Sequence, residues 1–241
     1  MAIEQLRDRP DRVADEGQAR RQDEAFRQIW QAFRTNRTVE DGRHDSEDWR
    51  TRSGPFASLV ISIPAEAIQP RLDAFRAVVD PLPIVRVHPD HFLHLTLQEL
   101  GFVTDDPHRR DEIHPDRLAE IAQAAAAIGE EAPFTLALGG VNAFQDAIFL
   151  DVHDGGACAR LHARLRELAA IKSSPRYPFL PHVMIAHFLD PAPIGRLPAL
   201  LAPWRDRTFG EVIVAGVEVV TIPIDVTYPA LQRRAIIPLR S

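Results

Sequence analysis

Two short stretches of the chain repeat one pattern. Residues 94–97 read His-Leu-Thr-Leu inside an apolar run that ends at Val103, and residues 182–185 read His-Val-Met-Ile inside a run that ends at Leu189. Each stretch places a histidine at the start of an expected strand. An imidazole titrates near pH ~6.5, so two facing histidines can serve as an acid and a base near neutral pH. This pair is the best candidate for catalysis in the sequence.

Strand alternation predicts which side chains accompany each histidine. In the first strand we expect His94, Thr96 and Gln98 on one face and Leu95, Leu97 and Glu99 on the other. In the second we expect His182, Met184 and Ala186 on one face and Val183, Ile185 and His187 on the other. If the leucines, valine and isoleucine lie on the core, both histidines and Thr96 point into an open cleft.

A metal site is not expected. His88, His91 and His94 lie close in sequence, but strand alternation spreads them over both faces. The single cysteine, Cys158, excludes an intrachain disulfide and Cys-rich zinc spacing.

The composition limits the partners that the protein can have. The chain of 241 residues has a net charge of −6, so no global basic field indicates binding to long nucleic acid. Its beginning is polar, and no run of ~18 apolar residues predicts a membrane span. Neither G-x-G-x-x-G nor a P-loop occurs. We expect a cytoplasmic protein with no membrane partner.

The first 50 residues are more highly charged than the rest of the chain. They hold 22 charged residues, against 26% charged residues overall. Residues 1–20 are interpreted as a frayed or disordered arm. Phe26, Ile29, Trp30 and Phe33 follow helical spacing and predict an amphipathic helix that docks on the main domain, although binding to a partner or dimerisation is an alternative. We therefore divide the chain into a charged N-terminal arm at 1–50 and a domain at 51–241.

Strands and helices alternate twice beyond residue 55. We expect strands at 56–63, 84–87, 94–103, 134–141, 147–152, 182–188, 209–223 and 231–239, and helices at 65–79, 116–128, 158–171 and 194–204. This order favours an α+β fold with mostly antiparallel sheets.

The two histidine motifs resemble the signature of the two-histidine (2H) phosphoesterase superfamily, which includes bacterial 2′-5′ RNA ligase-like proteins and cyclic phosphodiesterases. The family pattern is two His-x-Thr/Ser-x tetrapeptides, one per lobe, the second following a proline and an aromatic or basic stretch. Here residues 176–181, Arg-Tyr-Pro-Phe-Leu-Pro, precede His182. The resemblance covers roughly residues 55–240. It implies two pseudo-symmetric lobes with antiparallel sheets that form a central cleft.

The resemblance also implies a reaction. His94 and His182 would flank a phosphodiester, one as base and the other as acid, and Thr96 would donate its hydroxyl to a phosphate oxygen. Neither a metal nor another cofactor is needed. The expected substrates are RNA ends or small nucleotides with a 2′,3′-cyclic phosphate or a 2′-5′ linkage. Which histidine is the base stays open at this point, and we expect a monomer.

Met184 departs from the family pattern because it stands where the second Thr or Ser belongs. A thioether cannot donate a hydrogen bond, and losing one such donor can cost ~10²–10³ in rate. Arg176 or Tyr177 is a candidate replacement, and Tyr177 could also stack on a base. The alternatives are a weakened enzyme that binds RNA ends or nucleotides, and an interaction protein that works through the Phe26–Phe33 helix.

Overall fold

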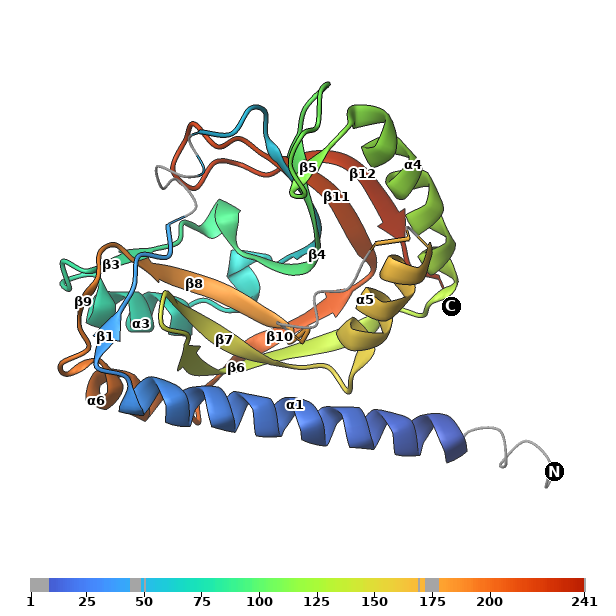
Figure 1. The fold of residues 1–241 in the computed structure, drawn as a ribbon. Coiled ribbons are helices and arrows are strands. Elements are labelled where there is room, and N and C mark those ends of the chain that lie inside the picture. The colour runs from blue at the N-terminus through green and yellow to red at the C-terminus, as the bar shows by residue number, and fades with distance from the viewer. Residues whose placement is uncertain (1–8, 44–48, 50, 169, 172–177, 241) are drawn as a thin grey trace.

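Two five-stranded sheets form the frame of the protein (Figure 1). The computed structural model describes residues 9–43, 49, 51–168, 170–171 and 178–240. Side chains are described from residue 17 onward within the first helix.

The first sheet has the strand order β12-β11-β2-β4-β5. All of its neighbours are antiparallel except β4 and β5, which run parallel. Its strands are β2 (Phe56–Ser62), β4 (His94–Val103), β5 (Glu112–Ile113), β11 (Gly216–Ile222) and β12 (Gln232–Pro238).

The second sheet has the order β10-β6-β7-β8-β3 and is antiparallel throughout. Its strands are β3 (Val85–Val87), β6 (Phe134–Ala143), β7 (Ala147–His153), β8 (His182–Phe188) and β10 (Thr208–Val214). Strands β4 and β8 lie next to each other where the sheets meet (Figure 1). The expected α+β fold with two lobes of antiparallel sheet is therefore confirmed.

The helices are exchanged between the lobes. Helix α3 (Arg71–Val79) follows a strand of the first sheet but packs against β3 of the second. Helix α5 (Ala157–Leu168) follows a strand of the second sheet but packs against β4 of the first, beside α4 (Pro115–Ala125). The remaining short elements are η2 (Ala65–Ala67), η3 (Asp90–Phe92), η4 (Ala126–Glu130), β9 (Ala192–Pro193), α6 (Leu197–Leu201) and η5 (Ala202–Trp204). Each exchange ties one lobe to the other.

Most expected elements occur near their expected bounds, with two clear divisions. The single strand expected at 209–223 is two strands, β10 and β11, which are separated at Ala215 and lie in different sheets. The helix expected at 65–79 is split into η2 and α3, and α3 begins directly after Pro70. Proline lacks the N–H that a helix interior requires, so the longer helix cannot run through this position. Its expected apolar face is nevertheless buried: Ile68, Leu72, Phe75 and Val79 are all fully inaccessible.

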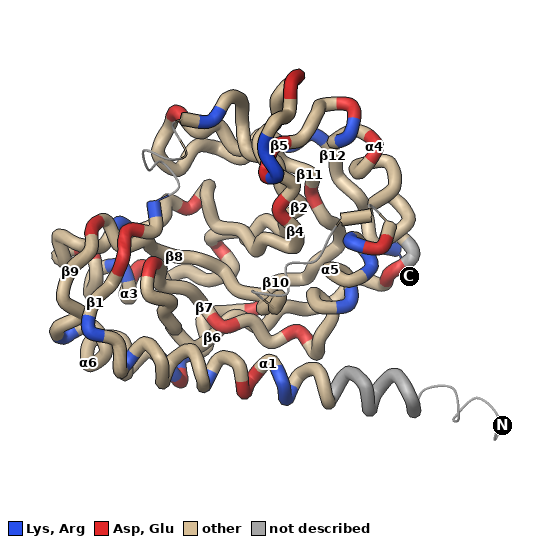
Figure 2. Tube along the Cα trace, in the orientation of Figure 1, with Lys and Arg blue, Asp and Glu red and all other residues tan. Residues whose placement is uncertain are grey.

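The expectation of a frayed arm at residues 1–20 is wrong for its second half. Helix α1 begins at Arg9 and runs to Thr35 along the second sheet, with charges of both signs on its outer side (Figures 1 and 2). The buried Gln22 donates to the carbonyl of Val152 on β7. Phe26 and Phe33, at most 2% exposed, pack into the core. A short strand, β1 (Thr38–Val39), then pairs with β9. Residues 1–8 lie outside the described part.

A buried polar network fixes α1 on the sheet. The amide of Asn142 donates to the carbonyl of Phe26 at 3.0 Å and to Asp151 at 2.9 Å. The Arg205 guanidinium pairs with Asp151 at 2.9 Å and lies over the Trp30 ring. Burial, partly offset by Arg205 and Asn142, raises the pKa of Asp151 to about 6. Because Asn142 and Asp151 are almost inaccessible, these bonds compensate for their desolvation.

No helix in the described part of the chain is both long enough and apolar enough to cross a membrane.

The raised pKa of Asp151 predicts a pH-dependent stability. The native carboxyl keeps its proton up to about pH 6, whereas the unfolded value is 3.8. Native Asp151 therefore holds more protons than the unfolded chain in this window, and stability is lost as the pH rises through it. Relative to Asp151→Asn, the native protein should lose up to ~3 kcal/mol of unfolding free energy between pH 4 and 7. Urea titrations at several pH values measure this difference.

Asp105→Asn, in an exposed loop, serves as the matched control. A constant stability difference between the native protein and Asp151→Asn over this pH range would contradict the buried-carboxyl account.

Candidate active site

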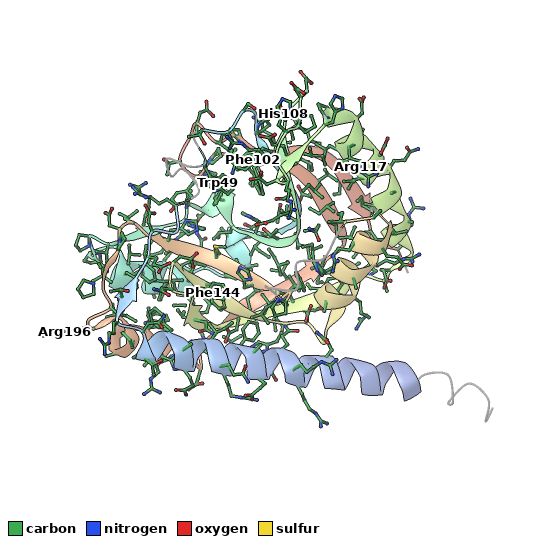
Figure 3. The ribbon with its side chains drawn as sticks, viewed as in Figure 1. Trp49, Phe102, His108, Arg117, Phe144 and Arg196 are labelled. Carbon is green, nitrogen blue, oxygen red and sulfur yellow. The ribbon has the colours of Figure 1, made fainter. Side chains whose placement is uncertain are left out.

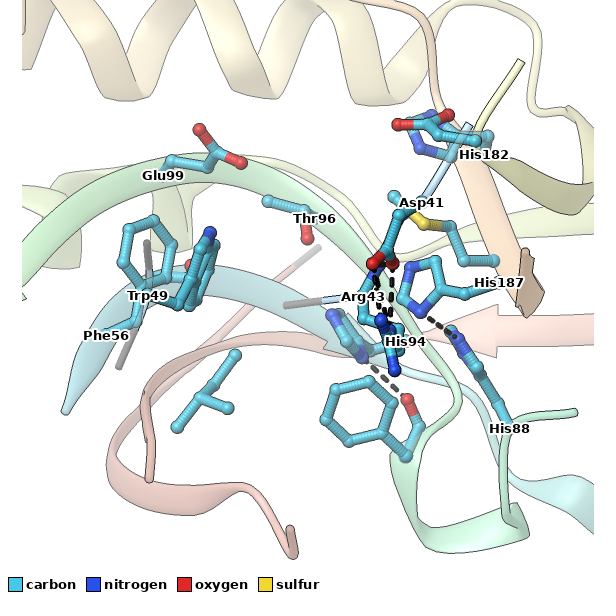
Figure 4. A pocket seen from close by; sticks show the side chains of 16 residues that line it. Asp41, Arg43, Trp49, Phe56, His88, His94, Thr96, Glu99, His182 and His187 are labelled. Carbon is cyan, nitrogen blue, oxygen red and sulfur yellow. Dashed lines mark hydrogen bonds and ion pairs between the residues drawn. The ribbon is translucent and has the colours of Figure 1, made fainter. Parts of the chain in front are cut away.

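The two histidine motifs open β4 and β8 and face one cavity of about 400 Å³ (Figure 4). The side chains that alternate with the histidines, Leu95, Leu97, Val183 and Ile185, are at most 1% exposed. His94, Thr96, His182 and Met184 are half-buried and line the cavity. The structure therefore brings together these four residues, as the strand pattern predicted.

Both imidazoles are held by the same local hydrogen bond. Nδ1 of His94 lies 2.7 Å from the carbonyl oxygen of Phe92, and Nδ1 of His182 lies 2.8 Å from that of Leu180. A carbonyl oxygen can only accept, so Nδ1 carries the hydrogen in each ring. In the neutral ring Nε2 is then the basic nitrogen, and in the charged ring it is a donor. The two histidines thus present the same atom for proton transfer.

Aromatic rings pack around each imidazole. Phe92 meets His94 edge-on, with ring centroids 5.2 Å apart. Phe144 and Phe149 meet His182, with centroids 5.2 and 5.3 Å away. Phe149 also packs against Phe26 of α1, so the N-terminal helix supports the second histidine indirectly. This packing restricts the orientation of both rings.

Burial lowers the pKa of His182, although the carbonyl of Leu180 and the charge of Asp146 act in the opposite direction. His182 is therefore mainly neutral at pH 7, with a basic Nε2. Burial in turn raises the pKa of Asp146, and the neighbouring Glu40 adds to this effect. Asp146 also lines the cavity and is a site residue that the sequence motifs did not indicate.

The expected face of Gln98 and Glu99 is wrong, because β4 contains bulges. The register against β2 shifts between Thr96 and Gln98, so Leu97 is an extra residue. A bulge moves later side chains to the opposite face. Glu99 therefore lines the cavity in place of Gln98 (Figure 4). The Glu99 side chain is exposed to solvent. The surrounding wall nevertheless desolvates the carboxylate in part, which raises its pKa.

A histidine on helix α5 donates a hydrogen bond to the bulge in β4. Nδ1 of His162 on α5 donates to the carbonyl of Leu97 at 2.7 Å. Its ring stacks on Phe179 at 4.2 Å, directly before the second motif. Burial lowers the pKa of His162, which keeps the ring neutral. The bulge in β4 is thus connected to the segment that leads into β8.

The expected face of His187 is also wrong, because β8 contains a bulge. The pairing of β8 with β7 shifts around Ile185, so His187, not Ala186, follows Met184 on the cavity side. Its Nδ1 lies 3.1 Å from Nε2 of His88 and 3.2 Å from the Tyr228 hydroxyl. His88, which alternation alone did not assign to the site, lines the same wall.

The N-terminal arm supplies cavity residues that lie outside the repeated motifs. Asp41, Gly42, Arg43 and Trp49 line the cavity. Trp49 packs against Phe56 and Phe102, with centroids 4.9 and 5.1 Å away, at the end far from His182 (Figures 3 and 4). Nothing in their spacing distinguished these residues from a polar loop. The boundary at residue 50 stays a prediction.

Two expected substrate-binding residues, Arg176 and Tyr177, lie outside the described residues. Among the residues that are described, no group of three His, Cys, Asp or Glu side chains is arranged to hold a metal ion.

A family model described as the 2′-5′ RNA ligase superfamily matches residues 64–222. The chain belongs to this superfamily of 2H phosphoesterases. The resemblance of the two motifs is thereby confirmed, and membership supports a phosphoesterase. The match begins after the arm, so Arg43 and Trp49 fall outside it. No curated protein sequence matches the chain.

Solved structures share the 2H phosphoesterase fold. TT0787 of Thermus thermophilus is 23% identical with a TM-score of 0.58, and covers 77% of this chain and 98% of its own. E. coli LigT complexed with 3′-AMP is 18% identical with a TM-score of 0.59, and covers 78% and 99%. A structure described as a phosphoesterase is 19% identical with a TM-score of 0.57, and covers 78% and 99%.

The His162 bond predicts a measurable loss of stability. His162→Phe keeps a ring against Phe179 but leaves the buried Leu97 carbonyl without its donor. The free energy of unfolding should fall by about 1–3 kcal/mol in urea denaturation. The exposed His108→Phe is the control, and a surface change of this kind should stay within ~0.5 kcal/mol. Equal stability of both variants would show that the bulge needs no such support.

Proposed function

We propose that the protein is a phosphoesterase that acts on a 2′,3′-cyclic phosphate or a 2′-5′ phosphodiester of RNA or nucleotides. The observation that carries this proposal is the matched pair of imidazoles. In both, Nδ1 is bonded to the carbonyl two residues earlier, which leaves Nε2 as the proton-transfer atom in one cavity. Metal-independent acid-base catalysis follows from such a pair.

The proposed hydrolysis balances with water as the only co-reactant. His182 Nε2 takes a proton from water as the water oxygen bonds to phosphorus. The bond from phosphorus to the leaving ribose oxygen breaks, and His94 Nε2–H protonates that oxygen. Thr96 donates its hydroxyl to a non-bridging oxygen, where charge increases in the transition state. The product is a nucleoside monophosphate, and the histidines then exchange protons with solvent.

The lowered pKa of His182 is the reason for assigning it as the base. A base must be neutral before it accepts a proton, and burial favours the neutral ring. The nearby Asp146 carboxylate then stabilises the imidazolium that forms. In the reverse direction the two roles exchange.

The far end of the cavity fits a nucleobase. Trp49, Phe56 and Ile222 form an apolar wall there, beside the carboxyl of Glu99. Aromatic side chains stack on bases in single-stranded sites. LigT was crystallised with 3′-AMP, and 3′-AMP is one of the products that hydrolysis of a 2′,3′-cyclic nucleotide yields. These features support small nucleotides or RNA ends as substrates.

Met184 favours a second candidate, a nucleotide-binding protein with weakened catalysis. The thioether lines the cavity where the family pattern has a hydroxyl donor. Calorimetric binding of 3′-AMP without turnover, unimproved by Met184→Thr, would support this binder. An increase in turnover by Met184→Thr would support an enzyme.

Turnover of the four 2′,3′-cyclic nucleotides in EDTA tests the enzyme. Because each histidine moves a proton, His94→Ala and His182→Ala should each lower kcat by ~10²–10⁴. His108→Ala, an exposed histidine, should retain the native rate and is the control. Equal rates in the native protein and in both active-site variants would exclude the two-histidine mechanism.

The pH profile tests the role of His182. As the pH falls, His182 becomes protonated and the proposed base is lost, so kcat/KM should decline on the acidic side. Asp146→Asn removes a charge that favours the imidazolium, so this acidic limb should move to lower pH. Steady-state rates between pH 4.5 and 8 measure the limb. Movement to higher pH would contradict the assignment.

A further inference from the structure

We propose that Arg43, supplied by the N-terminal arm, binds the phosphate of the substrate and takes the place of the donor that the second motif lacks at Met184. This inference rests on the proposed function and identifies an anion-binding residue in the same cavity. Arg43 lies outside the part of the chain that the family model matches.

The charges around the cavity require a cation. Three carboxylates line it, those of Asp41, Glu99 and Asp146. Arg43 is the only Lys or Arg among the described residues of its wall. A phosphodiester carries one negative charge, and the carboxylates would repel it. A guanidinium matches phosphate oxygens in charge and in shape.

The arm is fixed where it enters the cavity. The N–H of Glu40 donates to the carbonyl of Gln145 at 2.8 Å, and that of Gly42 to the carbonyl of Phe188 at 3.1 Å. A Cβ on Gly42 would lie 2.2 Å from the carbonyl oxygen of Asp146, so only glycine fits this approach. The backbone bonds therefore place Arg43 at the carboxyl end of β8, the strand that carries His182 and Met184 in its first half.

Asp41 orients the guanidinium. Nε and Nη2 of Arg43 donate to the two carboxylate oxygens at 2.9 and 2.6 Å (Figure 4). The backbone N–H of Arg43 donates to the same carboxylate at 3.0 Å. The pair lowers the pKa of Asp41, which keeps it charged. An arginine held in this way loses less rotational freedom when it binds an oxyanion. Its side chain lines the cavity and is 30% exposed, and a second carboxylate, that of Asp190, lies 3.9 Å from Nη2.

Binding of 3′-AMP, measured by calorimetry, tests Arg43 without requiring turnover. Arg43→Gln should weaken binding about 10-fold to 100-fold, the value of a charged hydrogen bond. Arg37→Gln, an exposed arginine on the same arm, is the matched control and should bind like the native protein. If Arg43→Gln unfolds, Arg43→Lys replaces it and should bind about 3-fold to 10-fold more weakly, because a lysine cannot keep the two-point bond to Asp41 that orients the cation. Native affinity in the folded variant would overturn the proposal.

A double-variant cycle tests whether Arg43 replaces the missing hydroxyl. Met184→Thr should increase turnover of 2′,3′-cyclic AMP by a larger factor in the Arg43→Gln protein than in the native one, because the new hydroxyl compensates for the lost guanidinium. Equal factors would show that the two positions act independently and would overturn the replacement.

The two proposals fail in different ways. Native turnover that depends on both histidines, together with native behaviour of Arg43→Gln, would overturn only the role of Arg43. Absence of turnover, together with weakened 3′-AMP binding by Arg43→Gln, would leave the anion site in place and overturn the catalytic proposal.

Discussion

The site depends on one constraint: the apolar residues that alternate with the two histidines are buried in a single core. Leu95 and Leu97 of β4 and Val183 and Ile185 of β8 belong to one continuous cluster that spans both lobes. Because strand side chains alternate, burying these four forces His94 and His182 to the opposite side. Turning either strand over would expose its apolar residues to water and bury its imidazole, so core packing and site geometry are coupled.

Polar interactions then refine what the core positions. The imidazole of each motif is held by the carbonyl two residues before it, so the ring orientation is set by the segment that leads into the strand. Helices outside the two motifs position the rest of the cavity wall. His162 on α5 satisfies the bulged carbonyl of Leu97 on β4, and Phe149 connects α1 with His182. The exchanged helices therefore hold together a cavity whose two walls come from distant parts of the chain.

The N-terminal arm forms part of the cavity wall. Buried bonds from Gln22 and Asn142 fix α1 on the second sheet, and the chain then returns along β9 into the cavity. The family model matches the chain only from residue 64 onward, so this wall lies outside the matched residues. In our proposals, it brings a cation to a site whose second motif has lost a hydroxyl. The solved relatives are less than 25% identical and establish the fold alone.

The sequence by itself determined the two motifs, the strands that carry them and the faces of Leu95 and Val183, because these follow from local alternation and burial. It could not place Glu99 or His187, since a bulge of one residue reverses every later face and leaves no periodic signal. The positions of Asp146 and Arg43 at the site also could not be predicted from the sequence. They lie at the site because the chain folds back on itself, and such contacts between distant residues are decided only by the tertiary structure.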